Sequence, residues 1–291
     1  MKIGIHDADK TKFPNLALMK LSAAYKQAGH EVEFFAPGKQ YDKVVSSKVF
    51  TFTEKDPELP ATTILGGVGY DVAKKLPESV EHLMPDYTLY RCDKSYGFLT
   101  RGCLRSCPWC FVPRKEGGIR PHADIEEFLA HDSVVLMDNN VLACGHGIAQ
   151  IEKLGRLGVK VDFNQGMDAR LIDDSIAKRL KKVKWLYPVR LACDSASQMP
   201  SIQKAVTLLR WHGVTPSKYF VYVLVKDVDD ALERVKFLRG MWVDPFCQPY
   251  IDFDGTPPTL LQRQLARWVN TKQAFTSMSF EEYVAWRGER V

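Results

Sequence analysis

The first 90 residues alternate short apolar runs with one clear helical pattern. Residues 15–28 carry apolar side chains at helical spacing, and Gly29 follows them as a suitable helix end. The predicted strands cover residues 2–6, 31–35, 43–49 and 63–65. Strands and a helix joined by short connections predict a parallel, doubly wound α/β sheet. A linker containing Pro77 and Pro85 follows, so we expect a domain over residues 1–90.

The second part of the chain repeats a strand and a helix at regular intervals. The predicted strands cover residues 96–100, 134–137, 159–163, 189–193, 219–225 and 246–251. The predicted helices cover residues 124–129, 147–157, 173–179, 201–212 and 228–239. Six β/α units without a hairpin signal predict an open or partial (β/α)6 barrel over residues 91–257. Such folds carry their active sites at the carboxyl ends of the strands.

The last 34 residues are rich in aromatic side chains and begin with a helical pattern over residues 261–269. Their arginines, Arg263, Arg267 and Arg287, together with the aromatic rings, could clamp nucleic acid. A helical cap packed on the barrel explains the same residues. We therefore predict a helical C-terminal extension over residues 258–291.

Composition and charge exclude several protein classes. The chain has 291 residues, of which 45% are apolar and 26% are charged, which excludes a disordered, collagen-like or coiled-coil protein. The longest clean apolar run, residues 219–225, is far shorter than the roughly 20 residues that cross a bilayer. The start, MKIGIHDADK, is charged, so we expect no secretory signal, no membrane partner and a cytoplasmic location.

The net charge is unevenly distributed along the chain. The whole chain carries +5, whereas residues 1–90 hold 11 basic and 12 acidic residues. The remainder therefore carries +6. An excess of this size allows an anionic substrate or nucleic acid but does not by itself predict one.

Three of the seven cysteines lie within eight residues, in the stretch FLTRGCLRSCPWCFVPRKEG. Cys103, Cys107 and Cys110 have the spacing C-x3-C-x2-C directly after a predicted strand. In a chain of this length, such a cluster indicates metal or redox chemistry and not a disulfide framework. One loop can bring three thiolates to an iron–sulfur cube and leave a fourth iron open for a ligand. A structural zinc site is disfavoured because no fourth Cys or His lies nearby.

At these residues the chain resembles the radical S-adenosylmethionine (radical SAM) superfamily. Trp109 stands at the aromatic position of that family's C-x3-C-x-aromatic-C motif, and the resemblance covers roughly residues 94–255. It implies that the three cysteines hold a [4Fe-4S] cluster that binds SAM. It further implies that flavodoxin or ferredoxin supplies an electron, and that SAM is cleaved reductively to a 5′-deoxyadenosyl radical. That radical would abstract hydrogen from an unidentified small-molecule or nucleic-acid substrate.

The resemblance also implies SAM-binding residues at the strand ends. After the second barrel strand, Asp138, Asn139 and Asn140 stand where relatives carry a Gly-Gly-Glu-like motif for the SAM amino group. The glycines are absent here, and the pattern is similar to an Asp-rich variant of relatives with a cobalamin-binding domain. A plain helix N-cap by Asn140 is the alternative.

Two further strand ends carry polar residues. Asn164, Gln165 and Arg170 follow the third strand, where the family contacts the ribose or carboxylate of SAM. Arg170 could bind a carboxylate bidentately or pair with a neighbouring aspartate. Asp194 and Ser195 follow the fourth strand and resemble a Glu-Ser pair that suits ribose binding. An N-cap by Ser195 is the alternative.

The remaining cysteines, Cys92, Cys144, Cys193 and Cys247, are scattered. They contain no C-x2-C pair, so an auxiliary cluster is disfavoured, and buried thiols are commonly inert. Cys193, near the predicted barrel mouth, is a candidate catalytic residue as a covalent group or hydrogen donor.

A Rossmann-like domain before such a barrel resembles the cobalamin-binding members of the superfamily. Their Asp-x-His-x-x-Gly motif is missing, because His6 precedes Asp7 and no other histidine has the required glycine spacing. Cobalamin binding therefore stays open but is not expected. The alternatives to our main hypothesis are a cobalamin-dependent methyltransferase, a tRNA-modifying enzyme and a non-catalytic iron–sulfur sensor.

Overall fold

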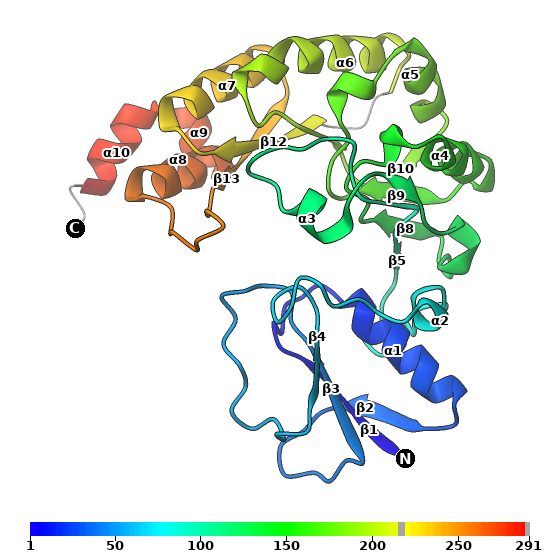
Figure 1. The fold of residues 1–291 in the computed structure, drawn as a ribbon. Coiled ribbons are helices and arrows are strands. Elements are labelled where there is room, and N and C mark those ends of the chain that lie inside the picture. The colour runs from blue at the N-terminus through cyan, green and yellow to red at the C-terminus, as the bar shows by residue number, and fades with distance from the viewer. Residues whose placement is uncertain (215–218, 289–291) are drawn as a thin grey trace. The chain divides into compact units, whose positions relative to one another are not determined.

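The computed structural model describes residues 1–214 and 219–288 as a mixed α/β structure with parallel sheets (Figure 1). The chain divides into two compact units. One contains Met1–Phe98 and His122–Val135, and the other contains Leu99–Pro121 and the chain from Leu136 onward. The division predicted from the sequence, at residues 90 and 257, is not tested by these units and stays a prediction. No helix in the described residues is long and apolar enough to cross a membrane.

The first unit is built on a four-stranded parallel sheet. Its strands are β1 (Lys2–Asp7), β2 (Glu31–Phe34), β3 (Lys43–Ser47) and β4 (Ile64–Gly66), in the order β2-β1-β3-β4. Helix α1 (Leu16–Gln27) begins after Asn15, whose side chain accepts a hydrogen bond from the Leu18 amide. Ile3, Ile5, Leu18 and Val45 form the buried core between the helix and the sheet. The predicted parallel sheet is confirmed.

The rest of the first unit corrects one prediction. Its elements are α2 (Glu78–Glu81), β5 (Ser95–Gly97), the 3-10 turn η1 (Ile125–Glu127) and β8 (Ser133–Leu136). The helix predicted over residues 124–129 is wrong, because only the turn η1 forms there. The Phe128 ring packs directly against Gly97, and the Phe128 carbonyl accepts a 2.5 Å hydrogen bond from the Tyr87 hydroxyl. Both contacts draw Phe128 out of helical geometry, to a φ of −138°.

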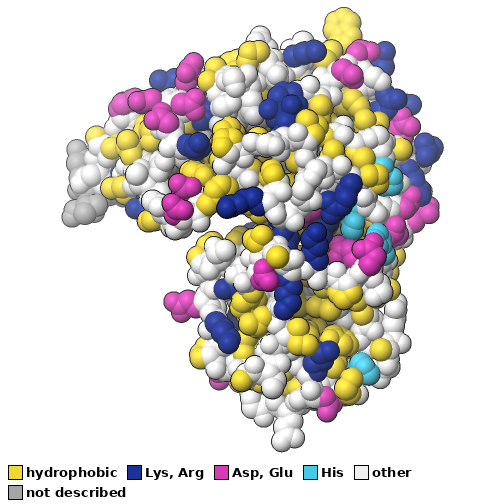
Figure 2. All heavy atoms as spheres, in the orientation of Figure 1, with side chains coloured by type: hydrophobic (Ala, Val, Ile, Leu, Met, Phe, Trp, Pro, Cys, Tyr) yellow, Lys and Arg dark blue, Asp and Glu magenta, His cyan; other side chains and the backbone are white. Residues whose placement is uncertain are grey.

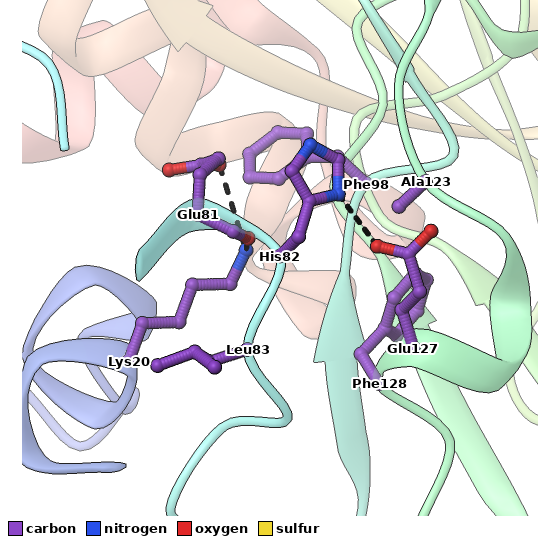
Figure 3. Close-up of a pocket in the computed structure, with 8 residues that line it drawn as sticks. All are labelled: Lys20, Glu81, His82, Leu83, Phe98, Ala123, Glu127 and Phe128. Carbon is purple, nitrogen blue, oxygen red and sulfur yellow. Dashed lines mark hydrogen bonds and ion pairs between the residues drawn. The ribbon is translucent and has the colours of Figure 1, made fainter. Parts of the chain in front are cut away.

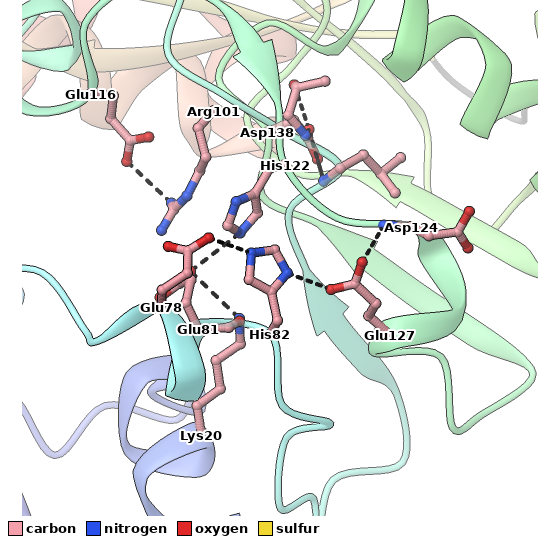
Figure 4. Close-up of polar contacts among 12 residues, drawn as sticks. Lys20, Glu78, Glu81, His82, Arg101, Glu116, His122, Asp124, Glu127 and Asp138 are labelled. Carbon is pink, nitrogen blue, oxygen red and sulfur yellow. Dashed lines mark hydrogen bonds and ion pairs between the residues drawn. The ribbon is translucent and has the colours of Figure 1, made fainter. Parts of the chain in front are cut away.

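A cluster of histidines and carboxylates joins α2 to η1 within the first unit (Figures 3 and 4). His82 lies between two acids, with Nδ1 2.6 Å from Oε2 of Glu127 and Nε2 3.1 Å from Oε1 of Glu78. His122 stands beside it, with Nε2 3.3 Å from Oε1 of Glu81. The recess in Figure 3 is lined partly by these groups, and none of its lining residues is a candidate site residue.

The second unit contains two short parallel sheets and an antiparallel pair. Strands β11 (Val189–Ala192), β12 (Tyr219–Val225) and β13 (Asp244–Pro249) pair in parallel, as do β9 (Lys160–Phe163) and β10 (Lys184–Trp185). Strand β12 alternates buried and half-buried residues, as the period of two for a strand requires. The strand predicted over residues 96–100 is divided, because β6 (Thr100–Arg101) pairs separately with β7 (Arg120–Pro121). These sheets confirm the α/β class, and closure into a partial barrel stays a prediction.

Helices follow the strands of the second unit as the sequence pattern predicts. They are α4 (Gly145–Leu157), α5 (Asp174–Leu180), α6 (Met199–Trp211) and α7 (Val228–Gly240), with short turns η2 (Val141–Ala143), η3 (Ala169–Leu171) and η4 (Ala196–Gln198). Helix α7 begins after Asp227, whose carboxylate accepts a hydrogen bond from the Asp230 amide.

Up to residue 288, where the described structure stops, the chain forms three helices after β13: α8 (Leu260–Asn270), α9 (Lys272–Ser277) and α10 (Phe280–Gly288). The side-chain amide of Asn270 pairs with strand β13: its oxygen accepts from the Cys247 amide and its nitrogen donates to the Cys247 carbonyl, both at 2.9 Å. The Trp268 ring packs against Phe275 and Phe280, which holds the three helices together.

The His82 cluster predicts a pH-dependent stability. The hydrogen bond from His82 to Glu127 raises the pKa of His82, so its contribution is complete below about pH 6.5 and is lost as the pH rises through the raised value. Burial raises the pKa of Glu127, but its bonds to His82 and the Asp124 backbone outweigh this, and the net shift is downward. That contribution is present above about pH 4.5 and is lost as the pH falls through the lowered value.

We expect the pair to stabilise the protein most between these limits, by up to about 1 kcal/mol for such a partly exposed group. His82→Gln should lower the urea midpoint more at pH 5.5 than at pH 8.5. His30→Gln makes the same substitution at a histidine whose ring contacts Tyr25, and this matched control should change the urea midpoint only slightly. An equal effect of His82→Gln at the two pH values would contradict the assignment.

Candidate functional site

The three clustered cysteines lie on a loop that is closed at its base. Strands β6 and β7 pair antiparallel, and Arg101 and Glu116 form a 3.1 Å ion pair inside the loop. Gly102 has a φ of +80°, and a Cβ there would lie 2.2 Å from the Gly118 carbonyl oxygen. Only glycine therefore allows the two ends of the loop to approach this closely. Helix α3 (Val112–Glu116) completes the return segment.

Asp138 fixes the start of the loop (Figure 4). Its carboxylate is buried and accepts hydrogen bonds from the amides of Leu99 and Thr100, at 3.1 and 2.6 Å, and from the Thr100 hydroxyl at 2.7 Å. Burial raises the pKa of Asp138, whereas these bonds act in the opposite direction. In this structure Asp138 positions the strand before the cysteines, and its predicted contact with a cofactor stays a prediction.

Cys103, Cys107 and Cys110 lie on this one loop. All three residues are partly exposed, and the Cys110 amide donates a 3.0 Å hydrogen bond to the Cys107 carbonyl in a tight turn. Burial raises the pKa of the Cys107 and Cys110 thiols. The charge of Cys103 raises both values further, and the charge of Cys107 also raises the pKa of Cys110. The guanidinium of Arg170 opposes this shift at Cys107.

A polar network stands beside Cys103. Its sulfur accepts hydrogen bonds from the Arg105 amide at 3.3 Å and from Nδ2 of Asn140 at 3.4 Å. Arg105 and Arg170 both bind Asp168, the second through Nε and Nη2 at 2.7 and 3.0 Å. Burial raises the pKa of Asp168, but the bonds from the two arginines outweigh this and lower it overall. The structure thus brings Cys103, Asn140 and Arg170 together through Asp168.

Asn140 has an unusual environment. The residue is only 2% exposed, and its side-chain oxygen, Oδ1, is buried without a hydrogen-bond partner. It precedes the turn η2 but makes no capping bond through its side chain, so the N-cap alternative is not observed. A buried acceptor without a donor is costly, which points to a missing partner at this position.

A second polar group forms at the carboxyl end of β11. Burial raises the pKa of Asp194, while hydrogen bonds from the Leu224 backbone and the Trp109 side chain oppose the shift. The Asp194 amide donates to Oε1 of Gln198 at 2.6 Å. The Lys226 ammonium lies over the Trp109 ring, 5.0 Å from the ring centroid. The motif tryptophan is therefore tied to the predicted residue Asp194.

Cys193 and its neighbour Ser195 have contrasting positions. Cys193 is fully buried, and burial raises its thiol pKa to about 12, so the thiol stays protonated at neutral pH. Its carbonyl accepts a 2.6 Å bond from the completely buried Arg234, which also donates to the Leu224 carbonyl and to Asp230. The Ser195 hydroxyl pairs with that of Ser197 at 2.9 Å and makes no capping bond.

The other predicted residues stand apart from these contacts. The backbone carbonyl of Asn164 accepts a 3.0 Å hydrogen bond from the Tyr222 hydroxyl. Gln165 is exposed and Asn139 is half-buried, and neither side chain forms a hydrogen bond within the described residues. Their predicted roles in SAM binding stay predictions. Within the described residues, no group of three or more His, Cys, Asp or Glu side chains is placed to hold a metal ion.

Sequence reasoning missed one buried charged network. Arg190 on β11 binds Asp162 on β9 bidentately, at 2.9 and 3.1 Å, and donates to the Tyr222 hydroxyl on β12. Asp162 is 2% exposed, and burial raises its pKa although the Arg190 charge opposes this. Single charged residues inside the apolar runs VDF and VRLA were the available signal, because a buried strand holds a charge only when it is paired. Arg105 was missed as well, whereas the pairing of Arg170 with the neighbouring Asp168 is the alternative that the sequence offered for Arg170.

Comparison with known proteins gives a weak structural similarity and no match to a family or a curated protein. No protein-family model and no curated protein matches the chain. A crystal structure of SuiB from Streptococcus suis, bound to S-adenosylmethionine, is similar at 14% identity and a TM-score of 0.44. The match covers 64% of this chain and 48% of that chain, so the chain spans about half the length of SuiB.

The hydrogen bonds of Asp138 predict that replacing it with asparagine, which has the same shape, destabilises the protein. Asp138→Asn turns one acceptor oxygen into a donor against buried amides, which should lower the free energy of unfolding by about 1–3 kcal/mol. Urea unfolding measures this, and Asp254→Asn, an exposed loop position, should change it by less than about 0.5 kcal/mol. Equal effects of the two substitutions would show that the carboxylate does not hold the loop.

Proposed function

We propose that this protein is a radical SAM enzyme that holds a [4Fe-4S] cluster with Cys103, Cys107 and Cys110. The observation that carries the proposal is the motif C-x3-C-x2-C with Trp109 at its aromatic position. Support comes from the surroundings of the motif, where a buried acceptor without a partner, Asn140 Oδ1, stands next to Cys103.

The donor set suits an iron–sulfur cube better than a single ion. Each thiolate of a cube binds a different iron, so the three sulfurs need not converge on one point. The amide of Asn140, the backbone of Arg105 and the charge of Arg170 would offset the negative charge of the thiolates.

When bound, the cluster would supply the electron for reductive cleavage of the C–S bond of SAM, and flavodoxin or ferredoxin would be the electron donor. The residues beside Cys103 suit the methionine part of SAM. Asn140 Oδ1 would accept from its amino group, which satisfies the orphaned acceptor. Arg170 uses Nε and Nη2 for Asp168, which leaves Nη1 for the carboxylate of SAM.

Asp194 and Trp109 would bind the nucleoside part. Asp194 lies at a strand end and is oriented by Trp109 and the Leu224 backbone, so its remaining acceptor positions suit ribose hydroxyls. Arg234 fixes the carbonyls on both sides of this position without reaching it. These groups bind and orient the ligand, and the hard chemistry belongs to the cofactor.

Reductive SAM cleavage tests the proposal. The chain would be reconstituted with iron and sulfide without oxygen, reduced with dithionite, and assayed for 5′-deoxyadenosine. We expect product from the wild type and none from Cys107→Ala. Cys144→Ala, a partly exposed cysteine outside the motif, should retain both iron and activity. Asn140→Leu should keep its iron and bind SAM about tenfold more weakly, because it removes the orphaned acceptor.

Three outcomes are distinguishable. Iron and sulfide without 5′-deoxyadenosine would favour an iron–sulfur sensor over an enzyme. Absence of iron and sulfide in the wild type would overturn the cluster assignment, and zinc should then be measured. Unchanged SAM affinity in Asn140→Leu would overturn the assignment of the amino-group acceptor alone.

A further inference from the structure

Two tryptophans in the second unit are almost completely exposed. Trp211, at the end of α6, is 83% exposed, and Trp242, just after α7, is 89% exposed. Trp242 also has a φ of +57°, in the left-handed region that disfavours large side chains. Large aromatic rings gain much from burial, so two rings left in solvent at neighbouring turns require an explanation.

A single arginine fixes these two turns to each other. Arg210, the residue before Trp211, donates from Nη1 to the Met241 carbonyl at 3.0 Å and from Nη2 to the Trp242 carbonyl at 3.2 Å. The turns precede β12 and β13 in the chain, so they lie at the amino edge of that parallel sheet. The candidate site, by contrast, lies at the carboxyl ends of the strands.

One lysine reaches the first of these turns, and two more lie at the end of α4. Lys181, which follows α5, donates a 2.7 Å hydrogen bond to the carbonyl of Gly213, two residues after Trp211. Lys182 packs against Gly155, and the Lys184 ammonium lies over Gly158 at the end of α4. All three lysines are exposed.

We call the group of Arg210, Trp211, Trp242, Lys181, Lys182 and Lys184 the tryptophan ridge. Figure 2 shows Lys and Arg side chains, with Asp and Glu side chains among them, along the edge that α4, α5 and α6 occupy in Figure 1.

We infer that the tryptophan ridge binds a single-stranded segment of nucleic acid. Exposed lysines supply phosphate contacts, and each indole offers a flat face on which a base can stack. Arg210 holds the two indole-bearing turns at a fixed separation, so the ridge is organised before it binds. Of the neighbouring acids, Glu152 pairs with Arg179, and Asp174 pairs both with Lys178 and with His212, the residue after Trp211.

The surroundings of the indoles favour nucleic acid over a lipid surface. Membrane association needs a continuous apolar face beside the tryptophans. Trp211 stands between Arg210 and His212, and the apolar side chains of α6 are used in the core, where Ile202 and Leu209 are fully buried. The two rings therefore stand apart from any apolar face and lie near Arg210 and exposed lysines, which suits bases stacked between phosphates.

The inference does not rest on the proposed function, because it needs neither cluster nor SAM. The test uses the purified full chain and fluorescence anisotropy with labelled 20-nucleotide single-stranded RNA and DNA of mixed sequence. Duplexes of the same sequence, and vesicles of phosphatidylcholine with phosphatidylserine, are the competing ligands. Affinity is measured from 50 to 300 mM salt.

We expect single strands to bind more tightly than duplexes or vesicles. Lys182→Glu should weaken binding about tenfold and reduce the slope of log affinity against log salt by about 0.7 or more. Trp211→Ala and Trp242→Gly should each weaken binding about tenfold with an unchanged slope, because they remove stacking and not charge. Trp242→Gly also suits the left-handed backbone, so loss of folding does not explain its effect.

Two exposed positions serve as matched controls. Lys272→Glu makes the same charge change on α9, and Phe52→Ala removes an aromatic ring of the first unit that is 73% exposed. Both should leave binding unchanged. The ridge variants should also leave iron content and 5′-deoxyadenosine formation unchanged, so failure of the cluster assignment does not affect this test.

Three results would overturn the inference: no binding of single strands at 50 mM salt, equal binding by the ridge variants and the wild type, or vesicle binding that the ridge variants abolish. The third would identify the ridge as a lipid-binding surface.

Discussion

The buried carboxylate of Asp138 is the contact on which the arrangement of the candidate site depends. It holds the amides of Leu99 and Thr100 as β6 begins, and β6 in turn closes the base of the cysteine loop. A carboxylate can accept several hydrogen bonds at once in a space where water is absent. The position of Cys103 therefore depends on Asp138, a residue 35 positions later in the chain. Both residues belong to the second unit.

Buried charged side chains also lie near Asp194, the second part of the candidate site. Arg234 is completely buried, yet its guanidinium is satisfied by the Cys193 and Leu224 carbonyls and by the Asp230 carboxylate. Arg190 and Asp162 form a similar pair between β11 and β9. Such pairs are poor sources of stability, because desolvation offsets most of the attraction. Their effect is to fix strand ends in one register, which is what a site made from several strand ends requires.

Much of the fold could be predicted from the sequence because its signals are local. Strand β12 and helix α1 are clear from periodicity and capping alone, and the cysteine spacing identifies the loop. The helix predicted over residues 124–129 failed because Phe128 packs on Gly97, a contact between segments about 30 residues apart. The hydrogen bonds of Asp138 to Leu99 and Thr100, and the contact of Arg105 with Asp168, could not be predicted for the same reason. Both depend on which strand ends become neighbours, and one sequence does not encode that in any local pattern.

The pairing of Asn270 with Cys247 has a consequence for the behaviour of the chain outside its native state. Strand β13 is the last strand in its sheet, and an unpaired strand edge offers amides and carbonyls to any other strand. The Asn270 side chain takes one such amide and one such carbonyl, and α8 covers that edge. When α8 detaches, the outer edge of β13 is free to pair with a strand of another molecule. The C-terminal helices therefore protect the protein from self-association as it folds.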